Sequence, residues 1–161
     1  LLQAGPTLAT YNAPNSVRAS AIFNDPPMNL LPATLLGSSA VRLEDGTELP
    51  LPGRNLTLAA GQSCRIGVRC HHLRMQSATN TPVSVASAVV LDCLLDLAEL
   101  SGSETYLHLH HGSVLLVAQW PGVHDLPLGA KLRVVLQPQE VFVFDSEGAL
   151  VSAPVGTGQG A

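Results

Sequence analysis

Charge is scarce in this chain. Charged residues make up 12% of its 161 residues, aromatic residues make up 4%, and Lys131 is the single lysine beside seven arginines. No basic run could neutralise a phosphate backbone, and the aromatic residues are spread singly, which offers no platform for base stacking. Together with a net charge of −4, these absences argue against nucleic acid as a partner.

Several motifs are also absent. No apolar run reaches the length of a membrane span, and no signal peptide opens the chain. Neither a phosphate-binding loop (Gly-x-x-x-x-Gly-Lys-Ser/Thr) nor a Gly-x-Gly-x-x-Gly after a strand occurs, so the chain lacks the usual means of binding and hydrolysing ATP. We therefore predict a soluble protein with no catalytic residues and no cofactor of its own.

The two ends of the sequence suggest a piece of a longer protein. The chain begins at Leu1 without an initiator methionine, and residues 156–161 are small and polar. We expect this last stretch to be a disordered tail. A hydrophobic fraction of 46% over the whole chain excludes disorder outside this stretch and predicts a sizeable core.

The cysteines point to packing rather than chemistry. Cys64, Cys70 and Cys93 are an odd number with no metal-like spacing. We expect them to be small buried hydrophobes with reduced thiols, as is usual in the cytosol.

Most of the sequence reads as β-strand. Two short helices are predicted first, over residues 8–11 and from 15 or 16 to 23, the second capped by Ser16, with Val17, Ile22 and Phe23 along one side. Asp25-Pro26-Pro27 ends that helix. Strands are predicted at 30–36, 40–43, 48–51, 64–68, 83–100 with a bend, 105–111, 113–120, 131–136 and 141–144. Asp45-Gly46 and Gly112 mark hairpins, and the polar stretch 76–82 marks either a break between sub-barrels or a loop. Phe142 and Phe144 share a strand face, where core packing is the simpler role. This pattern predicts a closed or sandwich-like β architecture.

Histidines are the strongest candidates for chemistry. His108 and His110 share a strand face, but we find no acidic or cysteine partner in register with them, so we predict a solvent-facing pair on an edge strand and no metal site. A triad of Ser101 or Ser103 with His108 and Asp92 can be written down. It lacks any motif that exposes a nucleophile, so a hydrolase is the least favoured function.

A resemblance to a known family rests on six segments in order. They are 1–6, 11–23, 26–31 (Pro-Pro-Met-Asn-Leu-Leu), 66–69 (Ile-Gly-Val-Arg), 99–107 and 141–145 (Val-Phe-Val-Phe-Asp). They resemble the ATP-binding subunits of carbohydrate-type ABC importers, the maltose and glycerol-phosphate transporter family. The chain departs from the family where Arg69-Cys70-His71 replaces Arg-Pro-Glu and where Asn24-Asp25 replaces Gly-Ser before the two prolines.

The resemblance implies a mainly β, OB-like barrel of the TOBE type, built of antiparallel strands with short N-terminal helices. Residues 1–25 would be the end of the nucleotide-binding domain with linker helices, and 26–155 the OB-like regulatory domain. The parent protein would bind ATP and Mg²⁺ in a domain outside this chain. It would work as a homodimer with membrane-spanning permease subunits on the inner face of a bacterial membrane, in some members under the control of a regulatory protein.

Few residues can be assigned roles at this stage. We predict that Pro26, Pro27, Met28 and Asn29 form a rigid elbow, in which Met28 packs and Asn29 hydrogen-bonds the turn. Arg69 and Glu104 are candidate contacts with a dimer mate or regulator. The alternative function is a β-barrel module that binds a small ligand, an oxyanion or a sugar, in a groove.

Overall fold

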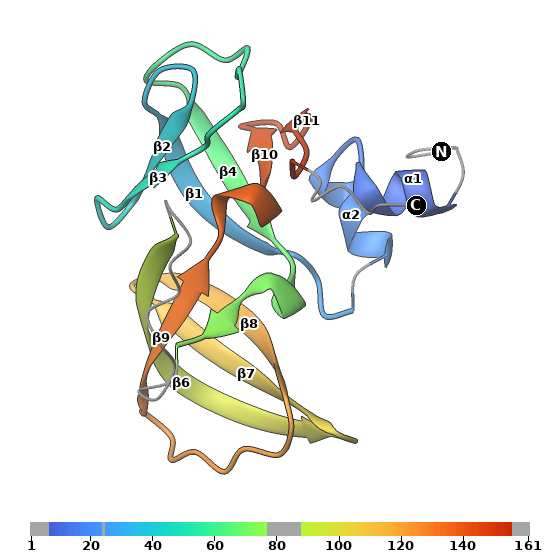
Figure 1. The fold of residues 1–161 in the computed structure, drawn as a ribbon, viewed down its shortest axis with the longest axis vertical. Coiled ribbons are helices and arrows are strands. Elements are labelled where there is room, and N and C mark those ends of the chain that lie inside the picture. Colours follow the sequence, from blue (N-terminus) through green and yellow to red (C-terminus); the bar gives the residue numbers. More distant parts are fainter. Residues whose placement is uncertain (1–6, 24, 77–87, 156–161) are drawn as a thin grey trace.

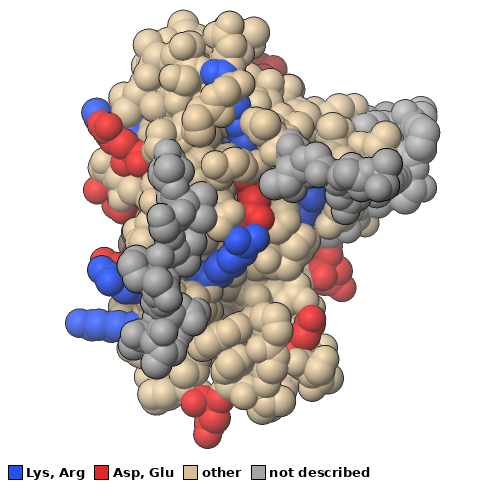
Figure 2. Space-filling view, viewed as in Figure 1, with Lys and Arg blue, Asp and Glu red and all other residues tan. Residues whose placement is uncertain are grey.

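The computed structural model describes residues 7–23, 25–76 and 88–155 of the chain (Figure 1, and Figure 2 as a space-filling view). Two short helices come first, α1 (Thr7–Asn12) and α2 (Val17–Phe23). The backbone N–H of Ala19 donates to Oγ of Ser16 (3.2 Å), so Ser16 caps α2 as predicted. Among the described residues no helix is both long and apolar enough to cross a lipid bilayer.

A six-stranded antiparallel sheet occupies the upper half of Figure 1. Its strands lie in the order β11-β10-β4-β1-β2-β3. They are β1 (Asn29–Leu35), β2 (Ala40–Leu43), β3 (Glu48–Pro50), β4 (Ser63–Val68), β10 (Phe142–Asp145) and β11 (Leu150–Ser152). Gly46 has a φ of +88° in the β2–β3 turn, a conformation that glycine adopts without steric cost, and it forms the hairpin that the Asp-Gly pair predicts.

A five-stranded antiparallel sheet lies below it, in the order β5-β9-β6-β7-β8 (Figure 1). Its strands are β5 (Arg74–Met75), β6 (Val89–Ser101), β7 (Glu104–His111), β8 (Val114–Pro121) and β9 (Lys131–Leu136). Two single turns of 3-10 helix, η1 (Cys70–His72) and η2 (Pro138–Glu140), link the two sheets. Sequence reasoning missed β5 and both turns, which are too short to leave a pattern.

The two sheets share one core. A single cluster of buried side chains includes Leu31 and Ile66 from the upper sheet and Leu91, Leu107 and Leu116 from the lower one. A second, small cluster holds Met28, Phe142 and Phe144, the two rings 6.1 Å apart, and confirms that these phenylalanines pack in the interior. The predicted mainly β class of antiparallel strands with short N-terminal helices is therefore correct.

Some local expectations need correction. Ile22 does not lie on the packed side of α2: its side chain is 64% exposed, and Ala19 and Ser20 are the buried residues instead. The bend predicted within 83–100 is a register shift between Leu95 and Leu97 in β6. Residues 83–87, most of the 76–82 break and the predicted tail lie outside the described residues. The domain boundary at 25/26 stays a prediction.

Candidate functional site

An open groove of about 430 Å³ crosses the outer face of the six-stranded sheet. Pairing between β1 and β2 begins only at Ala33, opposite Leu43. Pro32, one residue earlier, has no N–H to offer a neighbour, and this is where β2 separates from β1. The groove follows from that separation. Sequence reasoning missed it, although a proline inside a predicted strand was the available signal.

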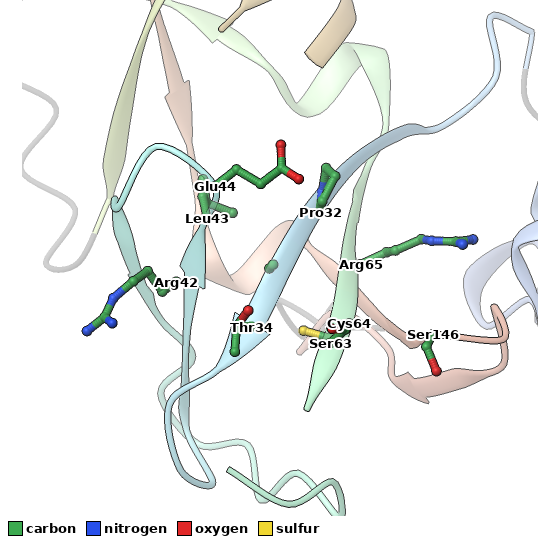
Figure 3. A pocket seen from close by; sticks show the side chains of 10 residues that line it. Pro32, Thr34, Arg42, Leu43, Glu44, Ser63, Cys64, Arg65 and Ser146 are labelled. Carbon is green, nitrogen blue, oxygen red and sulfur yellow. The ribbon is translucent and has the colours of Figure 1, made fainter. Parts of the chain in front are cut away.

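Polar side chains line this groove (Figure 3). Figure 3 shows the carboxylate of Glu44 turned toward Pro32, while Arg65 extends from β4 away from Glu44, with Ser146 below it in this view. Among the described residues no carboxylate pairs with Arg65, and Thr34, Ser63 and Ser146 add hydroxyl groups to the lining. Such a set of donors and acceptors suits a small polar ligand with hydroxyl groups and one acidic group.

The histidines of β7 contradict two expectations. His110 Nδ1 lies 2.8 Å from an oxygen of Asp96, and His108 Nε2 contacts the carboxylate of Glu99, so both rings do have acidic partners. The strand is also not an edge, since β7 lies between β6 and β8. The register shift at Asp96 explains the first error: it turns Glu99 to the same face as Asp96 despite the odd spacing of three.

These pairs do not assemble a reactive centre. Within the described residues no group of three or more His, Cys, Asp or Glu side chains could hold a metal ion. Asp92, the third member of the triad that could be written down, lies 3.4 Å from Nε of Arg133 rather than beside His108. The partly exposed contacts of His108 with Glu99 and of His110 with Asp96 are therefore interpreted as surface packing and not as a reactive site.

A hollow of about 400 Å³, lined mainly by aliphatic side chains together with His124 and Asp125, lies at the far end of the five-stranded sheet and is called the apolar hollow below. Four of its side chains are unusually exposed for their type: Leu97 (47%), Leu100 (62%), Val123 (67%) and Leu128 (72%). Exposed apolar residues that gather in one place mark contact surfaces more often than single ones do.

The segment that carries Val123 and Leu128 is held firmly. Thr105 Oγ1 donates to the Gly122 carbonyl (2.8 Å) and accepts from the N–H of His124 (3.1 Å). The His124 ring stacks on Trp120 with centroids 3.6 Å apart. At the other end of the segment, Gly129 N–H donates to the Leu95 carbonyl (2.7 Å). The hollow is therefore a fixed surface rather than a loose loop.

The two candidate contact residues lie in different surroundings. Glu104 is half-buried at the start of β7, where its carboxylate accepts from the Gln119 amide. Arg69 is 5% exposed, and its guanidinium lies 3.8 Å from the centre of the Tyr11 ring. Burial lowers the pKa of Arg69, and the nearby Tyr11 opposes that effect. Contact of either residue with a partner stays a prediction.

The Pro-Pro-Met-Asn segment joins parts of the fold. Met28 packs against Phe142 and Phe144, as predicted. Asn29 does not bond its own turn: its side-chain amide donates to the carbonyls of Val68 (3.2 Å) and Val117 (2.9 Å). The hydrogen bonds of Asn29 therefore connect the two sheets and do not stabilise a local turn as expected.

Comparisons with known proteins agree with the fold. Residues 25–73 match the MalK OB fold domain family. The chain is 28% identical over 148 residues to the sulfoquinovosyl glycerol transport ATP-binding protein SmoE of Agrobacterium fabrum, covering 89% of this chain and 38% of SmoE. It is 25% identical over 153 residues to the maltose/maltodextrin import ATP-binding protein MalK of Vibrio vulnificus, covering 91% and 39%.

Among solved structures, the cytoplasmic molybdate-binding protein ModG with molybdate bound has a similar fold. The TM-score is 0.57 at 16% identity, over 71% of this chain and 94% of that one. The chain spans about two fifths of the length of its curated relatives and corresponds to a part of them that is not catalytic. It is a relative of the C-terminal, MalK-type OB domains of the ATP-binding proteins of carbohydrate ABC importers.

Proposed function

We propose that this chain is the regulatory and dimerisation domain of the ATP-binding subunit of an ABC importer for a sugar, a polyol or glycerol phosphate. The proposal rests on the relationship to importer ATP-binding proteins such as SmoE and MalK. The absence of ATP-binding motifs from the sequence fits a non-catalytic role. In this proposal the parent subunit works on the inner face of the membrane with permease subunits, and a regulatory protein could act on this domain.

The apolar hollow is the main observation that supports dimerisation. Four large aliphatic side chains, each 47–72% exposed, gather there: two come from strand β6, and two come from the segment after β8 that hydrogen bonds and ring stacking hold in place. A second copy of the chain would bury them against an equivalent surface, as twofold homodimers commonly do.

Sedimentation of matched variants tests the dimer. Leu100→Glu places a charge in the hollow, and Ile22→Glu makes the same change on α2 at a nearly equal exposure, 64% against 62%. We expect wild type and Ile22→Glu to form a dimer at micromolar concentrations and Leu100→Glu to weaken it about tenfold or more. A wild-type chain that stays monomeric at every concentration would overturn the proposed role. Reading the coding sequence upstream of residue 1 for a phosphate-binding loop tests the ATPase parent.

The groove beside Pro32 supports a second candidate function, the binding of a small polar ligand. Arg65 would hold an acidic group, and Glu44 with the surrounding hydroxyls would bind hydroxyl groups. Calorimetry with molybdate, phosphate and simple sugars tests it, with Arg65→Gln as the binding variant and Arg18→Gln, on exposed α2, as the control. A heat of binding that is present in wild type and Arg18→Gln but lost in Arg65→Gln supports the site. The absence of any heat of binding with all of these compounds rejects it.

A further inference from the structure

The N-terminal helices are attached to the barrel by a short β-type seam. Ser16 and Ala149 form an antiparallel bridge. The N–H of Val17 donates to the Gly148 carbonyl, and the N–H of Leu150 donates to the Asn15 carbonyl, both at 2.9 Å. These bonds tie the start of α2 to the end of the six-stranded sheet, and Figure 1 shows both helices beside β10 and β11.

A second attachment is made by Arg69, which follows β4. Its guanidinium lies over two aromatic rings, 3.8 Å from the centre of Tyr11 in α1 and 4.9 Å from that of Phe142 in β10. Its Nη2 also donates to the Tyr11 carbonyl, near the end of α1. One side chain therefore contacts α1 through both ring and backbone while it packs on the core of the barrel.

The surroundings of Arg69 make this contact specific. No carboxylate among the described residues pairs with its guanidinium, and its Nε is buried without an acceptor. A buried cation needs compensation, and here the two π faces and one carbonyl supply it. Only a planar guanidinium can stack and donate in this way at once, so lysine would not replace it.

We propose that Arg69 is a positioning residue that locks α1 and α2 onto the barrel, so that helices and barrel move as one body. The proposal builds on the function given above. If the helices adjoin an upstream ATPase domain, a rigid attachment of the helices to the barrel transmits the movements of that domain to the barrel. Arg69 then acts inside the subunit, through Tyr11, rather than at an outer surface.

Limited trypsin digestion of the 161-residue chain tests the joint. Arg18 is exposed on α2, but the next residue, Ala19, is 1% exposed, so cleavage after Arg18 requires the helix to leave the barrel. We expect Arg69→Lys, which keeps the charge, to raise cleavage after Arg18 about tenfold relative to cleavage after Arg42 in β2. Tyr11→Ser should have the same effect.

A matched control separates this effect from general destabilisation. Arg54 is another buried arginine, 7% exposed, and it donates instead to the Pro138 carbonyl (2.8 Å) on η2. Arg54→Lys should lower stability without raising the ratio of the two cleavages. An equal rise in the ratio of the two cleavages for Arg69→Lys and Arg54→Lys, or no rise in either variant, would overturn the proposal that Arg69 locks the helices onto the barrel. The digestion is done at concentrations where the chain is monomeric, so its outcome is independent of the dimer.

Discussion

The side-chain amide of Asn29 pairs with the backbone of Val117 as a neighbouring strand would. The N–H of Val117 donates to Oδ1 (2.6 Å), and Nδ2 donates back to the Val117 carbonyl (2.9 Å). Asn29 is 5% exposed at the start of β1, while Val117 lies in β8, the last strand of the other sheet. This one amide provides hydrogen-bond partners for the N–H and carbonyl of Val117 on the edge strand of the lower sheet, and it thereby joins that sheet to the upper one.

Replacing Asn29 by aspartate should therefore destabilise the fold. The carboxylate would face the carbonyls of Val68 and Val117 where the amide now donates, leaving a buried charge against two acceptors. We expect a loss of about 3 kcal/mol in the free energy of unfolding, measured by urea titration. Asn55→Asp, on an exposed loop, serves as the control. An unchanged urea midpoint for Asn29→Asp would contradict the pairing.

Gly67 and Met28 lie in direct contact inside the small aromatic cluster. A Cβ atom on Gly67 would come within 2.5 Å of Met28 Sδ and 2.7 Å of Cε2 of Phe144. The methionine could shift, but the ring of Phe144 is fully buried and cannot. Gly67 is thus required by packing rather than by backbone conformation.

We expect Gly67→Ala to cost about 2 kcal/mol of stability through overpacking. Shortening the methionine in the double variant Gly67→Ala with Met28→Ala should relieve part of that cost, so the two changes should not be additive. Thermal unfolding of the four chains in this cycle measures the coupling. Strict additivity would show that the contact carries no strain.

Sequence patterns predicted the strands and hairpins well because they depend on alternation and on turn residues close in the chain. They also located Pro-Pro-Met-Asn and Ile-Gly-Val-Arg, but not the reason for either motif. That reason is their meeting in space: Met28 from the first lies on Gly67 from the second. Contacts between segments 39 residues apart leave no periodicity to read.

Other errors have the same origin. The single extra residue at Asp96 changed which side chains of β6 face outward, and this hid the partners of His108 and His110. The sequence also carried no sign that the guanidinium of Arg69 would lie over the rings of Tyr11 and Phe142. Neither a bulge nor a cation between two rings can be inferred from spacing alone.

Asp45 links the stability of the upper hairpin to pH. Burial raises the pKa of this carboxyl, but bonds from the hydroxyl (2.6 Å) and N–H (2.9 Å) of Thr47 and the nearby His111 lower it more, so the net pKa lies below its ordinary value. A pKa lowered by folding gives stability that is complete above the unfolded value of about 3.9 and is lost as pH falls through the folded value.

Asp45→Asn should therefore flatten the acid limb of the stability profile. We expect wild type to lose stability from about pH 4 downward more steeply than Asp45→Asn, in urea titrations between pH 2.5 and 6. Glu147→Gln, an exposed change at the β10–β11 turn, should keep the wild-type slope. Equal slopes for wild type and Asp45→Asn would show that Asp45 is not the linked group.

The three thiols should be inert while the chain is folded. Cys64, Cys70 and Cys93 are all free and buried. Burial raises the pKa of each thiol, for Cys93 to about 11, with the charge of Asp92 adding to the effect. Since the thiolate is the reactive form, a thiol reagent at pH 8 should label none of them in the native chain and all three in urea. Rapid native labelling of any one cysteine would mean that its side chain reaches solvent, and that the barrel opens locally at that strand.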